Sequence, residues 1–173
     1  MPAPAPTAPY DPLTAEAREL LFRAAAYLNA DEQAQLEKAC AYAFHAHDGQ
    51  TRKSGEPYIT HPMAVATQLA AWHMDGQGLC AGVMHDVLED TGITKIEMAA
   101  EFGDTIAEMV DGLSKLEKLE YNDQAEHQAE SFRKLILAMT KDIRVIVIKL
   151  SDRLHNMRTL GSMRPEKRRR IAQ

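Results

Sequence analysis

Apolar residues recur at helical spacing along most of the chain, and this pattern is the strongest constraint on its fold. Glycine, proline and short polar stretches separate the helical segments, and no sheet can be assembled from what remains. Aromatic residues make up only 6 % of the 173 residues, which also favours helix over sheet. We therefore predict an all-α fold. The expected helices cover about residues 14–28, 31–47, 62–74, 79–88, 94–103, 104–116, 128–139 and 144–157.

Residues that cap helix ends predict where several helices begin. Thr14 and Asp31 precede the first two helical patterns and are expected to be their N-caps. Thr94 is followed three residues later by Glu97, which makes a capping box for a helix that ends near Gly103.

Three segments carry mixed signals. Residues 144–148 are β-branched and would form a strand by propensity alone, but their pattern continues without a break, so we predict a buried helix. Gly76 and Gly78 are expected to break the chain ahead of the short apolar helix that follows them. Residues 117–127 are polar and charged, and we expect a mobile loop or a frayed helix there.

The chain is expected to hold one domain behind a short leader. Residues 1–12 include five prolines and are predicted to be disordered, while residues 13–173 suffice for a single core. The leader has no apolar signal core, and no segment approaches the roughly 20 apolar residues of a membrane span. Cys40 and Cys80 lie inside apolar helical patterns and indicate neither a disulfide framework nor a zinc motif. We expect a cytoplasmic protein with no membrane partner.

The charge of the chain is unevenly distributed. A net charge of −5 argues against a general nucleic-acid binder. Residues 141–158 and 164–170 are nevertheless basic. They are either solvated helix faces or part of a local pocket for a phosphorylated small molecule.

An imidazole and three carboxylates fall close together in the apolar segment after residue 79. On a continuous helix, Glu89 lies one turn from both His85 and Asp86, and Asp90 lies one turn from Asp86. Carboxylates this close repel one another unless a cation lies among them, so the pattern predicts a metal site. A lone His-Asp pair would more often be a hydrogen-bonded core histidine at an acidic helix end.

Two further segments could complete such a site. His61 precedes Pro62, so we expect extended backbone and an imidazole aimed into the site from just ahead of a helix. Asp152 and Asn156 are one helical turn apart; the first could supply a metal ligand, and the second could bond a sugar hydroxyl or a phosphate. Alone, the second segment would more often be a salt-bridged helix.

The combined candidates suggest one cation and a basic loop beside it. A set of two imidazoles and two carboxylates suits Mn²⁺, Fe²⁺ or Zn²⁺ better than Mg²⁺. Arg52 and Lys53, flanked by glycines, make a loop suited to phosphate binding or base stacking, although alone it would be a solvent loop. The four candidate metal ligands are His61, His85, Asp86 and Asp152.

Four motifs between about residues 38 and 160 resemble those of RelA/SpoT-homologue proteins. They are HxGQxRKSGEPYIxHP at 47–62, HDVxEDT at 85–91, VDGxxKL at 110–116 and KLxDRLHNMRTL at 149–160. The likeness is to the N-terminal HD-type hydrolase domain of the long, bifunctional members. It implies an HD-domain phosphohydrolase helical bundle over residues 13–173, as a fragment from which the synthetase and regulatory domains of the full-length chain are absent.

The resemblance also implies an activity. Such a domain is a 3′-pyrophosphohydrolase of guanosine tetra- and pentaphosphate, (p)ppGpp, in the stringent response, with Mn²⁺ as cofactor and GDP or GTP and pyrophosphate as products. Every metal and acidic position is filled, so we expect an active hydrolase. The resemblance assigns the metal to His61, His85, Asp86 and Asp152, the attacking water to Glu89 and Asp90, the guanine end to Arg52, Lys53 and Ser54, and the ribose side to Asn156.

Three other functions fit parts of this pattern. One is a stand-alone small alarmone hydrolase, against which residues 112–130 argue. Another is a catalytically silent regulatory domain that binds nucleotide or a partner protein without turnover. The third is a general HD phosphohydrolase of nucleotides or cyclic dinucleotides, and the basic loop at Arg52 argues against it.

Overall fold

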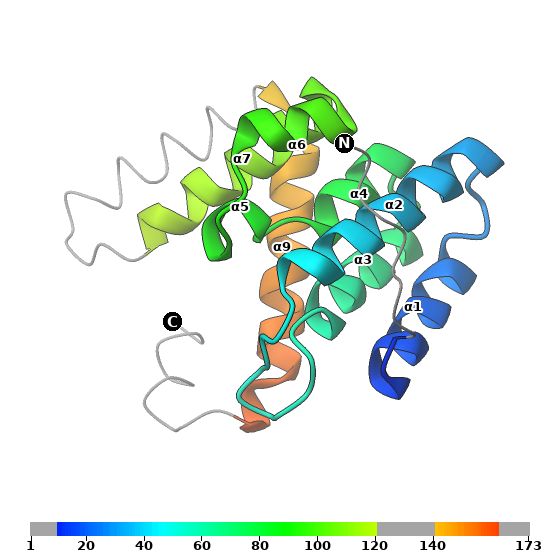
Figure 1. Ribbon diagram of the computed structural model, residues 1–173, viewed down its shortest axis with the longest axis vertical. Helices are drawn as coiled ribbons and strands as arrows, with labels where there is room; N and C mark the ends of the chain where they lie inside the picture. The colour runs from blue at the N-terminus through cyan, green and yellow to red at the C-terminus, as the bar shows by residue number, and fades with distance from the viewer. Residues whose placement is uncertain (1–9, 121–140, 163–173) are drawn as a thin grey trace.

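The computed structural model describes residues 10–120 and 141–162, without the side chains of residues 117–120 and 162. Within them the chain is helical, which confirms the all-α prediction (Figure 1). Thr51 and Pro57 form an isolated antiparallel bridge within a loop. The helices are α1 Pro12–Ala24, α2 Ala30–Ala46, α3 Thr60–Ala71, α4 Gly76–Val83, α5 Val87–Asp90, α6 Lys95–Phe102, α7 Asp104–Glu120, α9 Arg144–Arg158 and the 3-10 helix η1 Leu160–Ser162.

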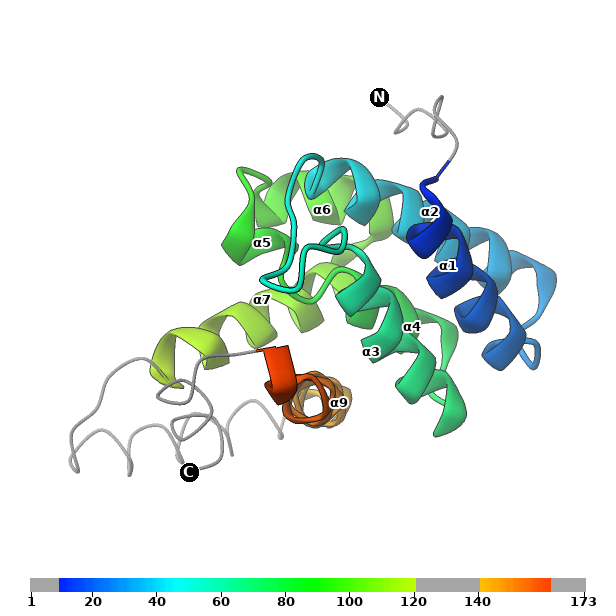
Figure 2. The same cartoon turned by 90° about the horizontal axis from the view of Figure 1, so that it is seen from below.

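Helices α3 and α4 form the centre of the bundle. Helix α3 packs against α1, α4 and α9, while α4 packs against α2, α7 and α9. Figure 2 looks along α9, which lies beside α3. The fully buried side chains Met63, Leu69, Leu79, Met84 and Ile148 come from these central elements, so apolar burial holds together the helices that carry the candidate site. In the described ranges, no helix is long and apolar enough to cross a membrane.

The first two helices begin at residues other than those expected. Asp11 caps α1, because its carboxylate accepts hydrogen bonds from the backbone N–H groups of Leu13 (3.0 Å) and Thr14 (3.1 Å). Thr14 is instead a buried residue of the first turn. Asn29, not Asp31, caps α2 and forms a capping box with Glu32. Pro12, the last residue of the expected leader, is already helical, and residues 1–9 lie outside the described part.

The later helix boundaries agree better with the pattern. The capping box of Thr94 and Glu97 is confirmed at the start of α6, which ends before Gly103. Residues 144–148 lie in α9, so the prediction of a buried helix is confirmed. Helix α7 continues to Glu120, so the start of the expected loop at 117–127 is helical. The rest of that loop and the helix expected at 128–139 lie outside the described residues.

The apolar segment after residue 75 is not the single helix that was expected at 79–88. Helix α4 contains the glycines that were expected to break it, and it ends at Val83; residues 84–86 form a turn, and α5 follows. Asp75 caps α4 by accepting a hydrogen bond from the Gly78 N–H (3.0 Å). A Cβ on Gly78 would lie 2.5 Å from Met74 Cγ, and one on Gly82 would lie 2.6 Å from Leu69 Cδ1. The absence of a side chain at Gly78 and Gly82 therefore allows Met74 and Leu69 to pack directly against the backbone of α4.

Capping of α1 by Asp11 can be tested by substitution. Asp11→Ala should lower the free energy of unfolding by about 1 kcal/mol at pH 7, whereas Asp11→Asn should retain most of the stability, because asparagine is also a strong N-cap. Urea unfolding of the three proteins measures this. Equal loss in both variants, or loss in neither, would contradict the assignment of the cap.

The same cap predicts a dependence on pH. Burial is the largest single influence and opposes ionisation of Asp11, but its hydrogen bonds with Thr14 and Leu13 together outweigh burial and lower its pKa below the usual 3.8. A lowered pKa in the folded state stabilises the fold above the unfolded pKa, and this contribution is lost as pH falls through the folded value. The stability difference between wild type and Asp11→Asn should therefore shrink below about pH 4. A stability difference that stays constant down to pH 2 would contradict a lowered pKa of Asp11 in the folded protein.

Candidate metal centre

Three parts of the fold bring the candidate metal ligands together. His61 lies in the first turn of α3, Asp152 lies in the middle of α9, and His85 with Asp86 lies in the turn between α4 and α5. His61 was expected in extended backbone ahead of the helix, and this was wrong. Pro62 is itself within the first turn, where a missing N–H costs no helical hydrogen bond, so the helix starts before it.

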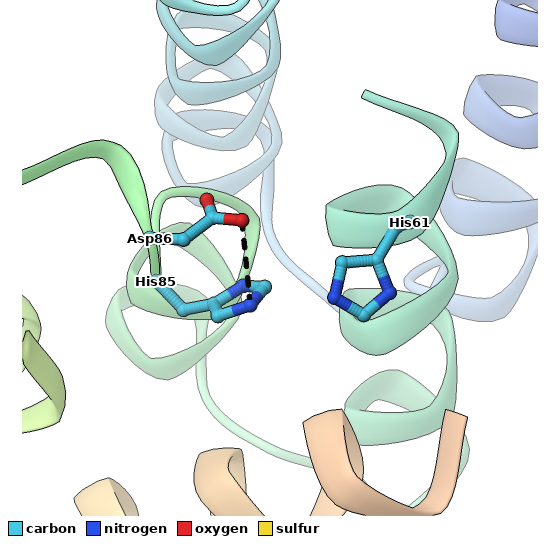
Figure 3. Close-up of side chains that lie close together, drawn as sticks. All are labelled: His61, His85 and Asp86. Carbon is cyan, nitrogen blue, oxygen red and sulfur yellow. Dashed lines mark ion pairs between the residues drawn. The ribbon is translucent and has the colours of Figure 1, made fainter. Parts of the chain in front are cut away.

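The distances among these side chains fit one shared cation. His61, His85 and Asp86 each offer a ligand atom within 4.8 Å of the others (Figure 3). His61 Nε2 lies 3.1 Å from Asp152 Oδ1. His85 Nε2 lies 3.7 Å from Asp86 Oδ2 and 3.8 Å from Asp152 Oδ1, which is too long for hydrogen bonds.

Backbone contacts fix the ring of His85 in an orientation that suits a ligand. Its Nδ1 lies 2.9 Å from the Gly82 carbonyl oxygen and donates to it in the neutral ring. The Nε2 lone pair then faces the oxygens of Asp86 and Asp152. In metal-binding histidines, the ring nitrogen that does not bind the metal commonly donates its N–H to a backbone carbonyl oxygen. The three atoms that face one another, His85 Nε2, Asp86 Oδ2 and Asp152 Oδ1, could therefore all bind one divalent cation.

The electrostatics of the centre agree with this arrangement. Asp86 is 8 % and Asp152 7 % exposed. Burial alone would raise the pKa of Asp86, but the neighbouring His85 and a hydrogen bond with His47 hold it well below its usual range. The pKa of Asp152 is also low, because the contacts with His61 and His85 outweigh burial. The pKa of His61 is lowered, mainly by burial, so the imidazole is neutral and can act as a ligand.

Both oxygens of Asp86 have protein partners, which the sequence did not indicate. His47 Nε2 lies 3.2 Å from Oδ1, and the Tyr58 hydroxyl donates to Oδ2 at 2.6 Å. The Tyr58 oxygen also lies 3.1 Å from Asp90 Oδ2. His47 and Tyr58 stand inside the loop motif, but a spacing pattern cannot tell which motif residue touches which ligand.

Two other contacts around the centre were also missed. His61 Nδ1 lies 2.8 Å from His155 Nδ1, and burial lowers the pKa of His155 to about 4. Lys149 Nζ lies 3.5 Å from Asp152 Oδ2 on the same helix. The helical spacing of Lys149 and Asp152 could have suggested the ion pair, whereas the contact between His61 and His155 joins residues 94 positions apart.

The two acidic residues predicted to handle water lie on α5, beyond the turn. The expectation of a continuous helix through His85 and Asp90 was wrong, although Asp90 still approaches Asp86 through Tyr58. Asp90 is exposed, and Glu89 is half-buried.

The residues predicted to bind substrate lie in two parts of the fold, the loop before α3 and the C-terminal half of α9. Arg52 begins the exposed turn that carries Lys53 and Ser54, and its Nη2 donates to Thr159 Oγ1 (3.3 Å) at the end of α9. Arg52 Nη1 is buried and has no hydrogen-bond partner among the described residues. Asn156 donates to Asp152 Oδ1 at 2.8 Å, so it holds one of the candidate ligands.

Known proteins are similar in sequence to this chain over most of its length. A family model described as HD domain matches residues 39–173. The bifunctional (p)ppGpp synthase/hydrolase SpoT of Escherichia coli (strain K12) is 58 % identical over 146 residues, which are 84 % of this chain and 21 % of that protein. GTP pyrophosphokinase rsh of Brucella ovis is 46 % identical over 155 residues, which are 90 % of this chain and 21 % of its own length. The chain thus spans about a fifth of the length of these relatives.

A solved structure gives the same picture of the fold. It is described as "A metazoan ortholog of SpoT hydrolyzes ppGpp and plays a role in starvation responses". The similarity covers 83 % of this chain and 80 % of that one, with a TM-score of 0.62 and 27 % sequence identity. Together with the family match, it confirms the prediction of an HD-type helical bundle.

Metal binding at this centre predicts a gain in stability. Mn²⁺ at a hundredfold excess over its dissociation constant should stabilise the folded chain by about 2.7 kcal/mol. For a chain of this size this corresponds to a rise in Tm of roughly 5–10 °C, reversed by EDTA. Asp152→Asn should lose most of the rise, because the candidate ligand loses its negative charge. Asp142→Asn, which disturbs an ion pair with Arg144 at the other end of α9, should keep it. Thermal scans with and without Mn²⁺ test this, and an equal rise in Asp152→Asn would rule out Asp152 as a ligand.

Proposed function

Because this chain belongs to the HD domain family, and within it to the RelA/SpoT-homologue group, we propose that it is a metal-dependent 3′-pyrophosphohydrolase of (p)ppGpp. The products are GDP or GTP and pyrophosphate. The observation that carries the proposal is the meeting of two histidines and two aspartates, from three separate parts of the chain, around one gap. The named activities of the relatives support the choice of substrate.

We assign His61, His85, Asp86 and Asp152 to the metal and propose Mn²⁺ as the ion, because the mixed nitrogen and oxygen donors suit it. A divalent cation held there lowers the pKa of water and offsets the negative charge of the 3′-diphosphate. The lowered pKa of His61 and the low pKa values of Asp86 and Asp152 keep these three side chains in the form that binds a cation.

Glu89 and Asp90 are assigned to the attacking water. Both belong to α5, which starts directly after the turn that carries His85 and Asp86. The Asp90 carboxylate is linked to Asp86 through the Tyr58 hydroxyl, and neither residue belongs to the proposed ligand set. An ionised carboxylate can orient a water molecule and accept its proton as the water attacks phosphorus. Asp90 is exposed, which allows the proton to pass to solvent.

Arg52, Lys53 and Ser54 are assigned to the guanine end of the substrate. The Nη1 of Arg52 offers buried donor capacity that no described residue uses. A guanidinium can stack on a base and can bind phosphate through two parallel hydrogen bonds. Lys53 and Ser54 are exposed in the adjacent turn and accessible to a ligand.

Asn156 is assigned to the ribose side. One N–H of its amide is used by Asp152, which leaves the other N–H and the oxygen for a sugar hydroxyl. In this assignment Asn156 orients a metal ligand and contacts substrate at the same time.

We also propose that residues 13–173 act as the hydrolase domain of a longer, cytoplasmic protein. The relatives are about five times as long as the matched region, and the first is named as both a synthase and a hydrolase. Synthetase and regulatory domains of the same chain would then be its partners, with no nucleic acid or membrane required for the reaction.

Turnover of ppGpp by the purified chain tests the function. Release of GDP and pyrophosphate is expected with Mn²⁺ and none with EDTA, resolved by anion-exchange chromatography. Asp86→Ala should abolish turnover, because it removes a metal ligand, while its far-ultraviolet circular dichroism stays that of the wild type. Binding of ppGpp without turnover in either condition would favour the silent regulatory domain, and activity retained in Asp86→Ala would reject the metal assignment.

The role of Asp90 makes a separate prediction. Asp90→Asn should lower kcat by about 10²–10⁴, the usual contribution of a general acid or base, because the amide cannot accept the proton. The Mn²⁺-induced rise in Tm should remain, since the ligand set is intact. Asp31→Asn is a suitable control, because Asp31 is exposed in the first turn of α2, far along that helix from His47. A kcat of Asp90→Asn equal to that of the control would exclude the proposed role.

A further inference from the structure

The hydroxyl of Tyr58 lies between two carboxylates that belong to different parts of the proposed machinery. It is 2.6 Å from Asp86 Oδ2 and 3.1 Å from Asp90 Oδ2. Asp86 is assigned to the metal and Asp90 to the attacking water. Within the described residues, Tyr58 thus forms a direct side-chain link between these two assigned groups.

The hydrogen-bond chemistry of a phenol limits what this link can be. Neutral tyrosine has one O–H donor, so its two short contacts must share a single proton. That proton is shared between the two carboxylates in a three-centre hydrogen bond, with the shorter contact to Asp86 and the longer one to Asp90. The position of the Tyr58 hydroxyl therefore orients both carboxylates.

The Tyr58 ring is held firmly enough to fix the hydroxyl. Its plane packs against the ring of His47, with centroids 4.7 Å apart at 35°. Its backbone N–H donates to the Gln50 carbonyl oxygen at 3.0 Å, across the turn closed by the Thr51–Pro57 bridge. The phenol position is therefore set by the loop and by α2.

His47 completes the support of Asp86 from the other side. Its Nε2 lies 3.2 Å from Asp86 Oδ1, while its Nδ1 faces the side-chain oxygen of Gln50 at 3.0 Å. With one oxygen on His47 and the other on Tyr58, the Asp86 carboxylate cannot rotate without breaking a hydrogen bond. Residues behind a metal ligand typically change metal affinity or activity by 10- to 100-fold when they are removed.

We propose that Tyr58 is a positioning residue that fixes the metal ligand Asp86 and, through the same hydroxyl, sets the orientation of Asp90 toward the attacking water. The second part rests on the proposed function, and the first part does not. Removal of the hydroxyl frees Asp86 to rotate and leaves Asp86 and Asp90 without a group between them, so metal binding and the chemical step weaken together. Binding of substrate is unaffected, because Tyr58 has no assigned contact with it.

Tyr58→Phe tests the proposal because it removes the hydroxyl and keeps the ring on His47. The dissociation constant for Mn²⁺, measured by calorimetry without substrate, should rise by about 10- to 100-fold. At saturating Mn²⁺, kcat for ppGpp should still fall about tenfold or more while KM stays within about twofold of wild type. Tyr42→Phe is the matched control, since Tyr42 packs edge-on against Phe102 (5.1 Å) and should change neither constant.

A double-mutant cycle separates the link to Asp90 from a general loss. If Tyr58 acts through Asp90, the loss of kcat in Tyr58→Phe combined with Asp90→Asn should be clearly smaller than the product of the single losses. Full multiplicativity overturns the link. An unchanged Mn²⁺ dissociation constant in Tyr58→Phe overturns the proposal, and so does a rise in KM at unchanged kcat, which would assign Tyr58 to substrate binding.

Failure of the proposed function is visible separately. If the wild-type chain binds Mn²⁺ but does not turn over ppGpp, the hydrolase assignment fails, while weaker Mn²⁺ binding in Tyr58→Phe still supports the positioning of Asp86. If Tyr58→Phe loses its helical circular dichroism, 3-fluorotyrosine at the same position keeps the hydroxyl and should keep Mn²⁺ binding near that of wild type. Loss of Mn²⁺ binding in that folded protein would overturn the proposal.

Discussion

The burial of two ionised carboxylates in a helical core is the constraint on which the rest of this structure depends. An unpaired carboxylate in such surroundings would take up a proton, because burial disfavours its charged form. Asp86 and Asp152 instead keep low pKa values, since donors reach them from several elements. Asp152 is supported by Asn156 and Lys149 from its own helix and by His61 from α3. Asp86 is held by His47, which caps the end of α2, and by Tyr58 of the following loop. The polar contacts of the centre therefore tie together the same helices that the apolar core packs.

The turn after α4 makes this arrangement possible. Gly82 allows α4 to approach Leu69 of α3 closely, which brings the end of α4 beside the first turn of α3, where His61 lies. Because the helix stops at Val83, the Gly82 carbonyl oxygen is left to accept from His85 and to orient that ring. The short helix α5 follows and carries Glu89 and Asp90. His85 and Asp86, assigned to the metal, therefore lie in the turn, and the two residues assigned to the water lie in the helix after it.

Much of this could be predicted from sequence, and the failures have local physical reasons. Helical periodicity gave the all-α fold, and unusual His and Asp residues in apolar surroundings gave the ligand candidates that the structure brings together. The break after Val83 was missed because residues 84–86 contain no glycine or proline, so the helix ends for reasons of packing that spacing does not reveal. At His61 two rules conflict: a residue before proline avoids helix, yet proline favours the first turn, and here the second prevails. Asp11 could have been found as a cap, because Pro12 directly after it marks the start of a helix.

The contacts that support Asp86 could not be predicted from the sequence for a different reason. His47 lies 39 residues from Asp86, and Tyr58 lies 28 residues from it, so both contacts exist only after the helices have packed. The same holds for Arg52, whose hydrogen bond to Thr159 spans 107 residues and joins the loop to the end of α9. Asp152 lies on that helix, and Tyr58 of the loop holds Asp86. The loop that carries Arg52 and Tyr58 is therefore connected to the candidate metal centre twice, once through α9 and once through the Tyr58 hydroxyl.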